Sequence, residues 1–197
     1  MLKLSYVVPA LAAMSLGLLV ACAPVPTEGA ANFATQLPVT RWDHRPEAED
    51  WTRATLAALR SEGAVLLSTT PDDIERYCPA YDAAGPDQRA AFWVGMFSAI
   101  AKYESTWNPA ASGGGGRYLG LLQISPQTAR GVGCDLSEGG LKDGASNLSC
   151  AVRIAANRVP AGPDNITGIT TDWGPMHDGS KRAEVAAWTS GQSYCKG

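Results

Sequence analysis

The chain has 197 residues, of which 45% are hydrophobic and 18% charged, and its formal net charge is −3. These values exclude an intrinsically disordered protein, which would carry fewer apolar and more charged residues. They also argue against a nucleic acid partner, because the longest basic run is the pair Lys181-Arg182. The two histidines, His44 and His177, do not make a zinc site without further ligands, so we expect no metal and no other cofactor.

Residues 1–21 are predicted to be an export signal. Residues 7–21 carry no charge and Lys3 precedes them. This segment is too short for a transmembrane helix, which needs about 20 residues, but it suits the apolar region of a signal peptide. The alternatives are a lipoprotein signal and a plain secretory signal.

The end of this segment, Leu19-Val20-Ala21-Cys22, resembles the cleavage box of bacterial lipoproteins. That resemblance implies that Cys22 becomes the lipidated first residue of the mature chain and anchors it to a membrane. Ala23 follows Cys22, which by the same resemblance favours the periplasmic face of the outer membrane. A cysteine present there by chance is the alternative.

Residues 22–40 are predicted to be the lipidated cysteine and a flexible tether. Residues 23–40 contain three prolines, one charge and little periodicity. The remaining residues, 41–197, are long enough for a single compact domain with its own core.

The first predicted helix begins near Pro46, a residue that suits the first turn, and ends before Gly63. Its spacing predicts one apolar face, made of Trp51, Thr55, Ala58 and Leu59.

Two short elements are expected next. The apolar run at 64–68 is the best strand candidate of the chain. A short helix is then predicted from Thr70, as its N-cap, and Pro71 to about Cys78.

The strongest helix prediction begins at Gly85-Pro86 and runs to about Ser105. A wide apolar stripe follows its length, made of Phe92, Trp93, Met96, Phe97, Ile100 and Tyr103. A fourth helix is predicted from Asn147 to Arg158, with Leu148, Val152 and Ile154 turned inward. The predicted fold is therefore mainly α-helical.

Four cysteines remain besides Cys22, and an even number in an exported chain predicts two disulfides. Three pairings are possible. We prefer Cys134–Cys150, which closes a short loop, together with Cys78–Cys195, which ties the C-terminus to the body of the domain.

Glu104 lies at the end of the predicted helix 86–105, four residues after Ile100 and seven after Phe97. Apolar surroundings and the negative end of the helix dipole should both raise its pKa. A carboxylic acid that is protonated near neutral pH is what protonation of a glycosidic oxygen requires. A solvated glutamate at a helix end is the alternative.

The segment after Glu104 carries a series of motifs. Glu104-Ser105 is followed by Gly120-Leu121-Leu122-Gln123-Ile124, then by Pro126 and Thr128-Ala129, and later by Asn147-Leu148. Over about residues 86–158 the chain resembles the soluble-type lytic transglycosylase family (SLT domain). The resemblance implies a lysozyme-like, mainly α fold of the α+β superfamily, and the glycan strands of peptidoglycan as the substrate.

The resemblance also implies a mechanism with one carboxylic acid, Glu104. As an acid it would protonate the leaving oxygen of the MurNAc–GlcNAc β-1,4 bond. As a base it would then accept the proton of the C6 hydroxyl that attacks C1, giving 1,6-anhydro-MurNAc without water. No second acid has a convincing position, since we take Asp135, Glu138 and Asp143 as surface charges.

Five further residues are expected to contact substrate: Ser105, Ser112, Tyr118, Gln123 and Trp173. Gln123 matches the family's motif glutamine, although an amide that bonds loop backbone is an equal alternative. Ser112 matches a family serine, although its spacing from Glu104 is one residue shorter. The ring of Tyr118 is expected either to stack on a sugar or to be an exposed loop residue without a role in binding.

The family's fourth motif, Ala-Tyr-Asn-Ala-Gly, is missing. The nearest string, Ala186–Gly191, has Trp188 in place of the tyrosine, and Trp173 lies closer to the expected spacing. Trp173, Trp188 and Tyr194 are candidates for that role or for the core. Two alternatives stay open for the whole chain: a goose-type muramidase that adds water, and a wall-binding lipoprotein with cell-envelope assembly partners and little activity.

Overall fold

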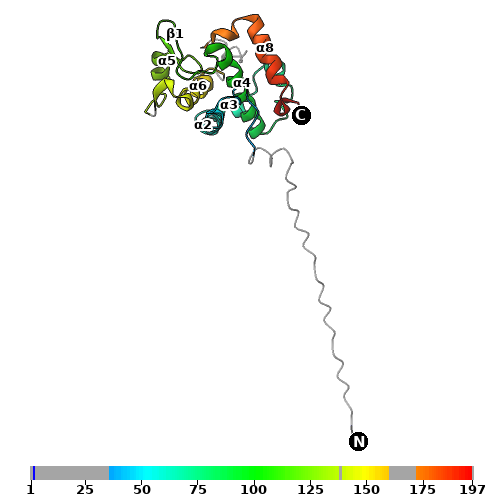
Figure 1. Ribbon diagram of the computed structural model, residues 1–197. Coiled ribbons are helices and arrows are strands. Elements are labelled where there is room, and N and C mark those ends of the chain that lie inside the picture. Colours follow the sequence, from blue (N-terminus) through cyan, green and yellow to red (C-terminus); the bar gives the residue numbers. More distant parts are fainter. Residues whose placement is uncertain (1, 3–35, 138, 160–171, 197) are drawn as a thin grey trace.

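The computed structural model describes residue 2 and residues 36–137, 139–159 and 172–196 (Figure 1). The predicted signal, Cys22 and most of the tether therefore lie outside the described residues. Of the tether, Leu37 packs against the core and Thr40 is buried, so the domain begins a few residues before 41. Among the described residues, no helix has the length and apolar character needed to cross a membrane.

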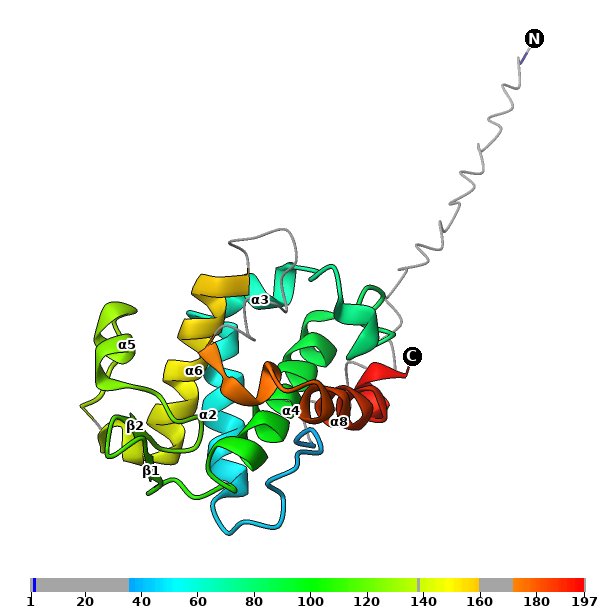
Figure 2. The ribbon, with the colours of Figure 1, turned by 90° about the horizontal axis from the view of Figure 1, so that it is seen from above.

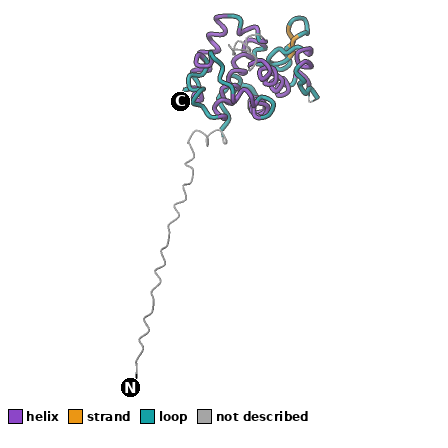
Figure 3. Tube along the Cα trace, turned by 180° about the vertical axis from the view of Figure 1, so that it is seen from behind, coloured by secondary structure: helices purple, strands orange, loops and turns teal. Residues whose placement is uncertain are grey.

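The described elements are mainly helical, as predicted, with one small β-hairpin (Figure 3). In chain order they are α2 (Ala48–Arg60), α3 (Ala64–Ser68), η1 (Ile74–Arg76), α4 (Pro86–Glu104), β1 (Ser112–Gly113), β2 (Tyr118–Leu119), α5 (Pro126–Gly131), η2 (Gly140–Lys142), α6 (Gly144–Arg158), η4 (Gly174–Met176), α8 (Gly179–Ser190) and η5 (Ser193–Cys195).

Helix α4 is the centre of the domain, because every residue from Ala90 to Ala101 is buried. Figure 2 shows α2 and α6 on one side of it and α8 on the other, and α2 contacts both α4 and α6. The predicted bounds are confirmed: Gly85 is the N-cap, Pro86 is in the first turn, and Ser105 is the C-cap. Because α4 is buried up to Ala101, the core fixes the position of its last residue, Glu104.

The predictions for the other two helices are confirmed with shifted starts. Helix α2 begins at Ala48 rather than Pro46, and its expected face is buried. Helix α6 begins at Gly144, because Asp143 caps it by accepting a hydrogen bond from the Ser146 amide (2.8 Å). Asp143 is therefore a capping residue and not a simple surface charge.

Two predictions were wrong. The run 64–68 is helix α3 and not a strand: Leu66 is buried while its neighbour Val65 is exposed, and a short apolar run does not distinguish the two structures. The short helix expected from Thr70 is only the 3-10 turn Ile74–Arg76, whose N-cap is Asp73.

The structure contains the preferred disulfides, Cys134–Cys150 and Cys78–Cys195. The first joins the segment after α5 to α6. The second joins the segment before α4 to the C-terminal turn η5, where the Ala80 amide also donates to the Cys195 carbonyl (3.2 Å).

Candidate active site

A cavity of about 480 Å³ opens at the C-terminal end of α4. It is lined by the end of α4, the β-hairpin, the loop of the second motif, the η4 segment and the first turn of α8. The lining residues are Tyr103, Glu104, Gly113, Gly114, Tyr118, Gln123, Asp172, Gly174, Pro175 and Lys181.

Glu104 is the last residue of α4 and its side chain lines this cavity. Burial raises the pKa of its carboxyl to about 7, and the positive charge of Lys181 opposes that rise. No hydrogen bond joins this carboxyl to another of the residues that the structure describes. Glu104 can therefore hold a proton near neutral pH and present it to a ligand in the cavity.

Gln123 lines the cavity from a strained position, since its φ is +47°. Its Nε2 donates to the Gly120 carbonyl (2.9 Å), and its Oε1 lies so close to Gly113 that a Cβ there would collide with it. The structure thus combines both expected roles: the amide is bonded to loop backbone and faces the cavity.

Gly120 and Asn147 explain why the second and third motifs occur together. Gly120 has φ +78°, and a Cβ there would collide with the Leu141 carbonyl and the Asn147 amide. Asn147 is buried; its Nδ2 donates to the Leu119 (3.0 Å) and Leu141 (2.9 Å) carbonyls, and its Oδ1 accepts from the Leu122 amide (2.9 Å). The start of α6 therefore holds the loop that carries Gln123.

Three of the expected substrate contacts are not among the described residues that line the cavity. Ser105 Oγ donates to the Leu121 carbonyl (2.9 Å), which ties the end of α4 to the motif loop. Ser112 is exposed on β1. Trp173 is only 2% exposed, and its indole nitrogen donates to the Leu122 carbonyl (3.0 Å) beside Phe97. Ser105 therefore supports the motif loop, and Trp173 is mostly buried but lines a smaller neighbouring cavity together with Tyr118 and Gln123.

The aromatic residues of the cavity are Tyr103 and Tyr118. Tyr118 belongs to the hairpin and is 44% exposed, so its ring is accessible to a ligand. Tyr194, a candidate for the missing tyrosine, is buried, and its hydroxyl donates to the Val39 carbonyl (3.3 Å). Trp188 packs under the Arg41 guanidinium, with 5.7 Å from the ring centroid to Cζ. Neither residue lines the cavity.

Sequence reasoning missed two charged lining residues, Asp172 and Lys181. Asp172 Oδ2 accepts from Arg158 Nε (3.1 Å). Lys181 lies in the first turn of α8, whose N-cap Asp178 accepts from the amides of Ser180 and Lys181. The capping aspartate Asp178 before the alanine-containing run could have predicted this helix. No pattern in the neighbouring sequence indicated that the helix packs near Glu104.

Within the described ranges, no group of three or more His, Cys, Asp or Glu side chains is placed to hold a metal ion. Asp135 is exposed, in keeping with a surface charge, and Glu138 lies outside the described residues. The chemistry available in the cavity is thus that of two carboxyls, one ammonium, one amide and two phenol rings.

The comparisons with known proteins agree with this geometry. Residues 84–169 match the family "Transglycosylase SLT domain". Two solved structures of Bd0314 DslA, a glutamate-to-glutamine mutant and wild-type form 2, are similar to this one, with TM-scores of 0.72 and 0.70. Each is 25% identical, and each alignment covers 82% of this chain and 100% of that chain. No curated protein sequence matches the chain.

The fold and the family thus confirm the resemblance to soluble-type lytic transglycosylases. At the level of the family, the SLT match supports peptidoglycan cleavage of the lytic transglycosylase type. Residues 84–169 of the chain thus resemble the transglycosylase SLT domain family.

Proposed function

We propose that the chain is a lytic transglycosylase that cleaves the MurNAc–GlcNAc β-1,4 bond and forms 1,6-anhydro-MurNAc. The observation that carries the proposal is Glu104, a carboxyl with a pKa of about 7 that lines the cavity without a hydrogen-bonding partner among the described residues. The same group can act first as an acid and then as a base, because its pKa lies near the working pH.

In this mechanism Glu104 donates its proton to the glycosidic oxygen while the bond to C1 breaks. The C6 hydroxyl of the same MurNAc then attacks C1, and the Glu104 carboxylate accepts its proton. The proton count of the enzyme is restored and no water is consumed. Gln123 and Tyr118 line the same cavity and offer an amide and a ring face to the sugars.

A second candidate, hydrolysis, is favoured by one observation: Asp172 brings a second carboxyl to the cavity of Glu104. Glycosidases that use water usually have two carboxyls, one as the acid and one that activates the water as a base. In that case Asp172 would act as the base while Glu104 acts as the acid.

The products of digestion separate these functions. Residues 23–197, oxidised and without lipid, are incubated with purified peptidoglycan, and the fragments are analysed by mass spectrometry. Fragments lighter by one water, ending in anhydro-MurNAc, support the proposal. Reducing-end fragments that disappear in Asp172→Asn support hydrolysis, and glycan binding without products supports a wall-binding protein.

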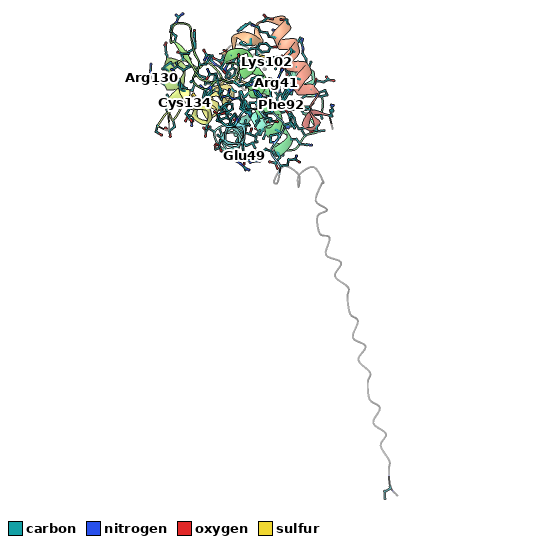
Figure 4. All side chains as sticks on the ribbon, in the orientation of Figure 1. Arg41, Glu49, Phe92, Lys102, Arg130 and Cys134 are labelled. Atoms are coloured by element: carbon teal, nitrogen blue, oxygen red, sulfur yellow. A yellow bond between two sulfur atoms is a disulfide. The ribbon has the colours of Figure 1, made fainter. Side chains whose placement is uncertain are left out.

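The acid is tested by Glu104→Gln, which keeps the shape and removes the proton. We expect the release of products to fall by at least about 100-fold, the usual contribution of general acid–base catalysis. Glu49→Gln is the matched control, because Glu49 (labelled in Figure 4) lies on the surface of α2 and pairs with Arg53 at 2.8 Å. Full activity of Glu104→Gln would refute the assignment.

We also propose that Cys22 is lipidated and holds the domain at the periplasmic face of the outer membrane. The support is the uncharged segment 7–21 followed by the Leu-Val-Ala-Cys string. Metabolic labelling with palmitate and membrane fractionation should show label in the full chain and none in Cys22→Ser. Equal labelling of both would overturn the proposal.

A further inference from the structure

Lys181 is the single Lys or Arg among the described residues that line the cavity. The cavity also contains the carboxyls of Glu104 and Asp172, and Asp172 is already paired with Arg158. With Glu104 protonated, the ammonium of Lys181 is thus the main uncompensated charge that a ligand meets there.

The partners of Lys181 leave its charge largely available. The nearest carboxylate oxygen, Asp178 Oδ2, is 4.0 Å away, and the Lys181 side chain is 43% exposed. Asp178 is occupied on its other oxygen, Oδ1, by Ser180 and by the Lys181 backbone amide. A pair at that distance and exposure contributes little, so a ligand would not have to break a strong internal bond.

Lys102 shows the contrast. Its ammonium also lies near the Tyr103 ring, at 5.0 Å from the centroid against 5.7 Å for Lys181. However, Lys102 Nζ is 3.1 Å from Glu184 Oε1, an oxygen that Arg41 shares (Figure 4 labels both cations). The charge of Lys102 is used inside the protein, whereas that of Lys181 faces the cavity.

The backbone that carries Lys181 is held in place. Glu184, one turn further along α8, accepts from Arg41, from Lys102 and from the Tyr103 hydroxyl (2.8 Å). These bonds join α8 to the end of α4, beside Glu104. The position of the ammonium relative to the acid is therefore set by the fold, although the side chain itself keeps its rotamer freedom.

We propose that Lys181 is a carboxylate-binding residue of the cavity, which selects glycan with an acidic group close to the scissile bond. This inference rests on the proposed function. Two sources supply such a group: the lactyl carboxylate of MurNAc without a stem peptide, and a carboxylate of the stem peptide itself. In either case the ammonium attracts the ligand's carboxylate and offsets its repulsion from Asp172, and from Glu104 once that residue has given up its proton.

The test measures binding in Glu104→Gln, which keeps the ligand intact. Three oligosaccharides of equal length are the probes: peptide-free GlcNAc–MurNAc, the same strand with stem peptides, and neutral chitin. Lys181→Met should raise the Kd of at least one acidic probe about fivefold, the size expected for a partly exposed ion pair. Chitin should bind unchanged. The acidic probe that is affected identifies the source.

Two further variants sharpen the test. Lys181→Arg keeps the charge and should retain most of the preference for the acidic probe. Lys142→Met removes an exposed lysine of the turn η2, which does not line the cavity, and should change no Kd. The inference is overturned if Lys181→Met weakens all three probes equally or none of them.

The failures of the two proposals are distinguishable. If the wild type releases anhydro products and Lys181→Met binds acidic and neutral probes as before, only the carboxylate site is wrong. If no glycan is cleaved but Lys181 still controls acidic binding, the transglycosylase proposal fails and the site stands. If no probe binds, both are wrong.

Discussion

The position of Glu104 at the end of α4 exposes its carboxyl to opposing effects on its pKa. Burial raises the pKa of the carboxyl to about 7, so the charged form is disfavoured in the folded protein. Lys181 from α8 lowers it, while Asp172 contributes a further negative charge to the same cavity. The group is thus poised between acid and base near neutral pH.

This pKa predicts how activity depends on pH. The reaction begins with protonated Glu104, so the rate on peptidoglycan should fall as the pH rises through about 7. Lys181→Met removes the charge that lowers the pKa and should move this fall to higher pH. The measurement is the pH profile of initial product release for both variants. A wild-type rate that is flat from pH 6 to pH 8 would contradict it.

The same pKa predicts a stability effect. A folded-state pKa above the ordinary 4.5 means that the folded chain binds the proton more tightly, so stability decreases as the pH rises from about 4.5 to about 7. The Glu104→Gln variant carries no charge at this position. Its free energy of unfolding should therefore exceed that of the wild type by about 2 kcal/mol above pH 7, and by less at lower pH. Urea unfolding at pH 5 and pH 8 measures this; equal differences at both values would contradict it.

At the scale of elements, the start of α6 supports the loop of the second motif. Asn147→Ala removes three hydrogen bonds and leaves buried backbone groups without partners, so we expect a loss of about 3 kcal/mol in the free energy of unfolding. Asn157→Ala is the control on the same helix, since this exposed asparagine only bonds the Arg153 carbonyl and should cost less than about 0.5 kcal/mol.

Activity completes that test. Because Asn147 holds the loop that carries Gln123, the Asn147→Ala variant should lose activity even at temperatures where it remains folded. A variant that is destabilised but retains full activity would show that the loop keeps its shape without Asn147.

Elements could be predicted where a local pattern was long enough. The predicted helix 86–105 combines a start signal with a long apolar stripe, so its bounds could be predicted from the sequence. The run 64–68 is too short for its period to be visible, and the chain packs it as a helical turn on Leu66. The length of the hydrophobic pattern therefore decided whether the type of element could be predicted.

At the scale of the whole molecule, the acid could be found from sequence and the rest of the cavity only in part. Glu104, Tyr118 and Gln123 lie within one motif-bearing segment and all line the cavity. Lys181 and Asp172 come from the C-terminal part, and only the packing of α8 and of the segment before η4 brings them there. Trp173 was expected at the substrate because its spacing fitted; its side chain packs beside Phe97 and lines only a smaller neighbouring cavity.

The disulfides act at this largest scale. Cys78–Cys195 spans 117 positions of sequence and encloses α4, the hairpin, α6 and α8, whereas Cys134–Cys150 spans 16. On the chain-entropy account, a loop of about 100 residues contributes about 4.7 kcal/mol and one of about 15 residues about 3 kcal/mol. Replacing both cysteines of the long pair by alanine should therefore destabilise the domain more than the same change in the short pair.

Guanidinium unfolding of the two double variants, under identical oxidising conditions, measures the difference. We expect the variant without Cys78–Cys195 to be the less stable by about 1–2 kcal/mol, because the cross-link also keeps η5 against α4. Its cleavage of peptidoglycan should fail at a lower temperature, since α8 carries Lys181 and Glu184 and lies between that cross-link and the cavity. An equal or larger loss in the variant without Cys134–Cys150 would show that strain or local packing, rather than loop length, governs the stability of this domain.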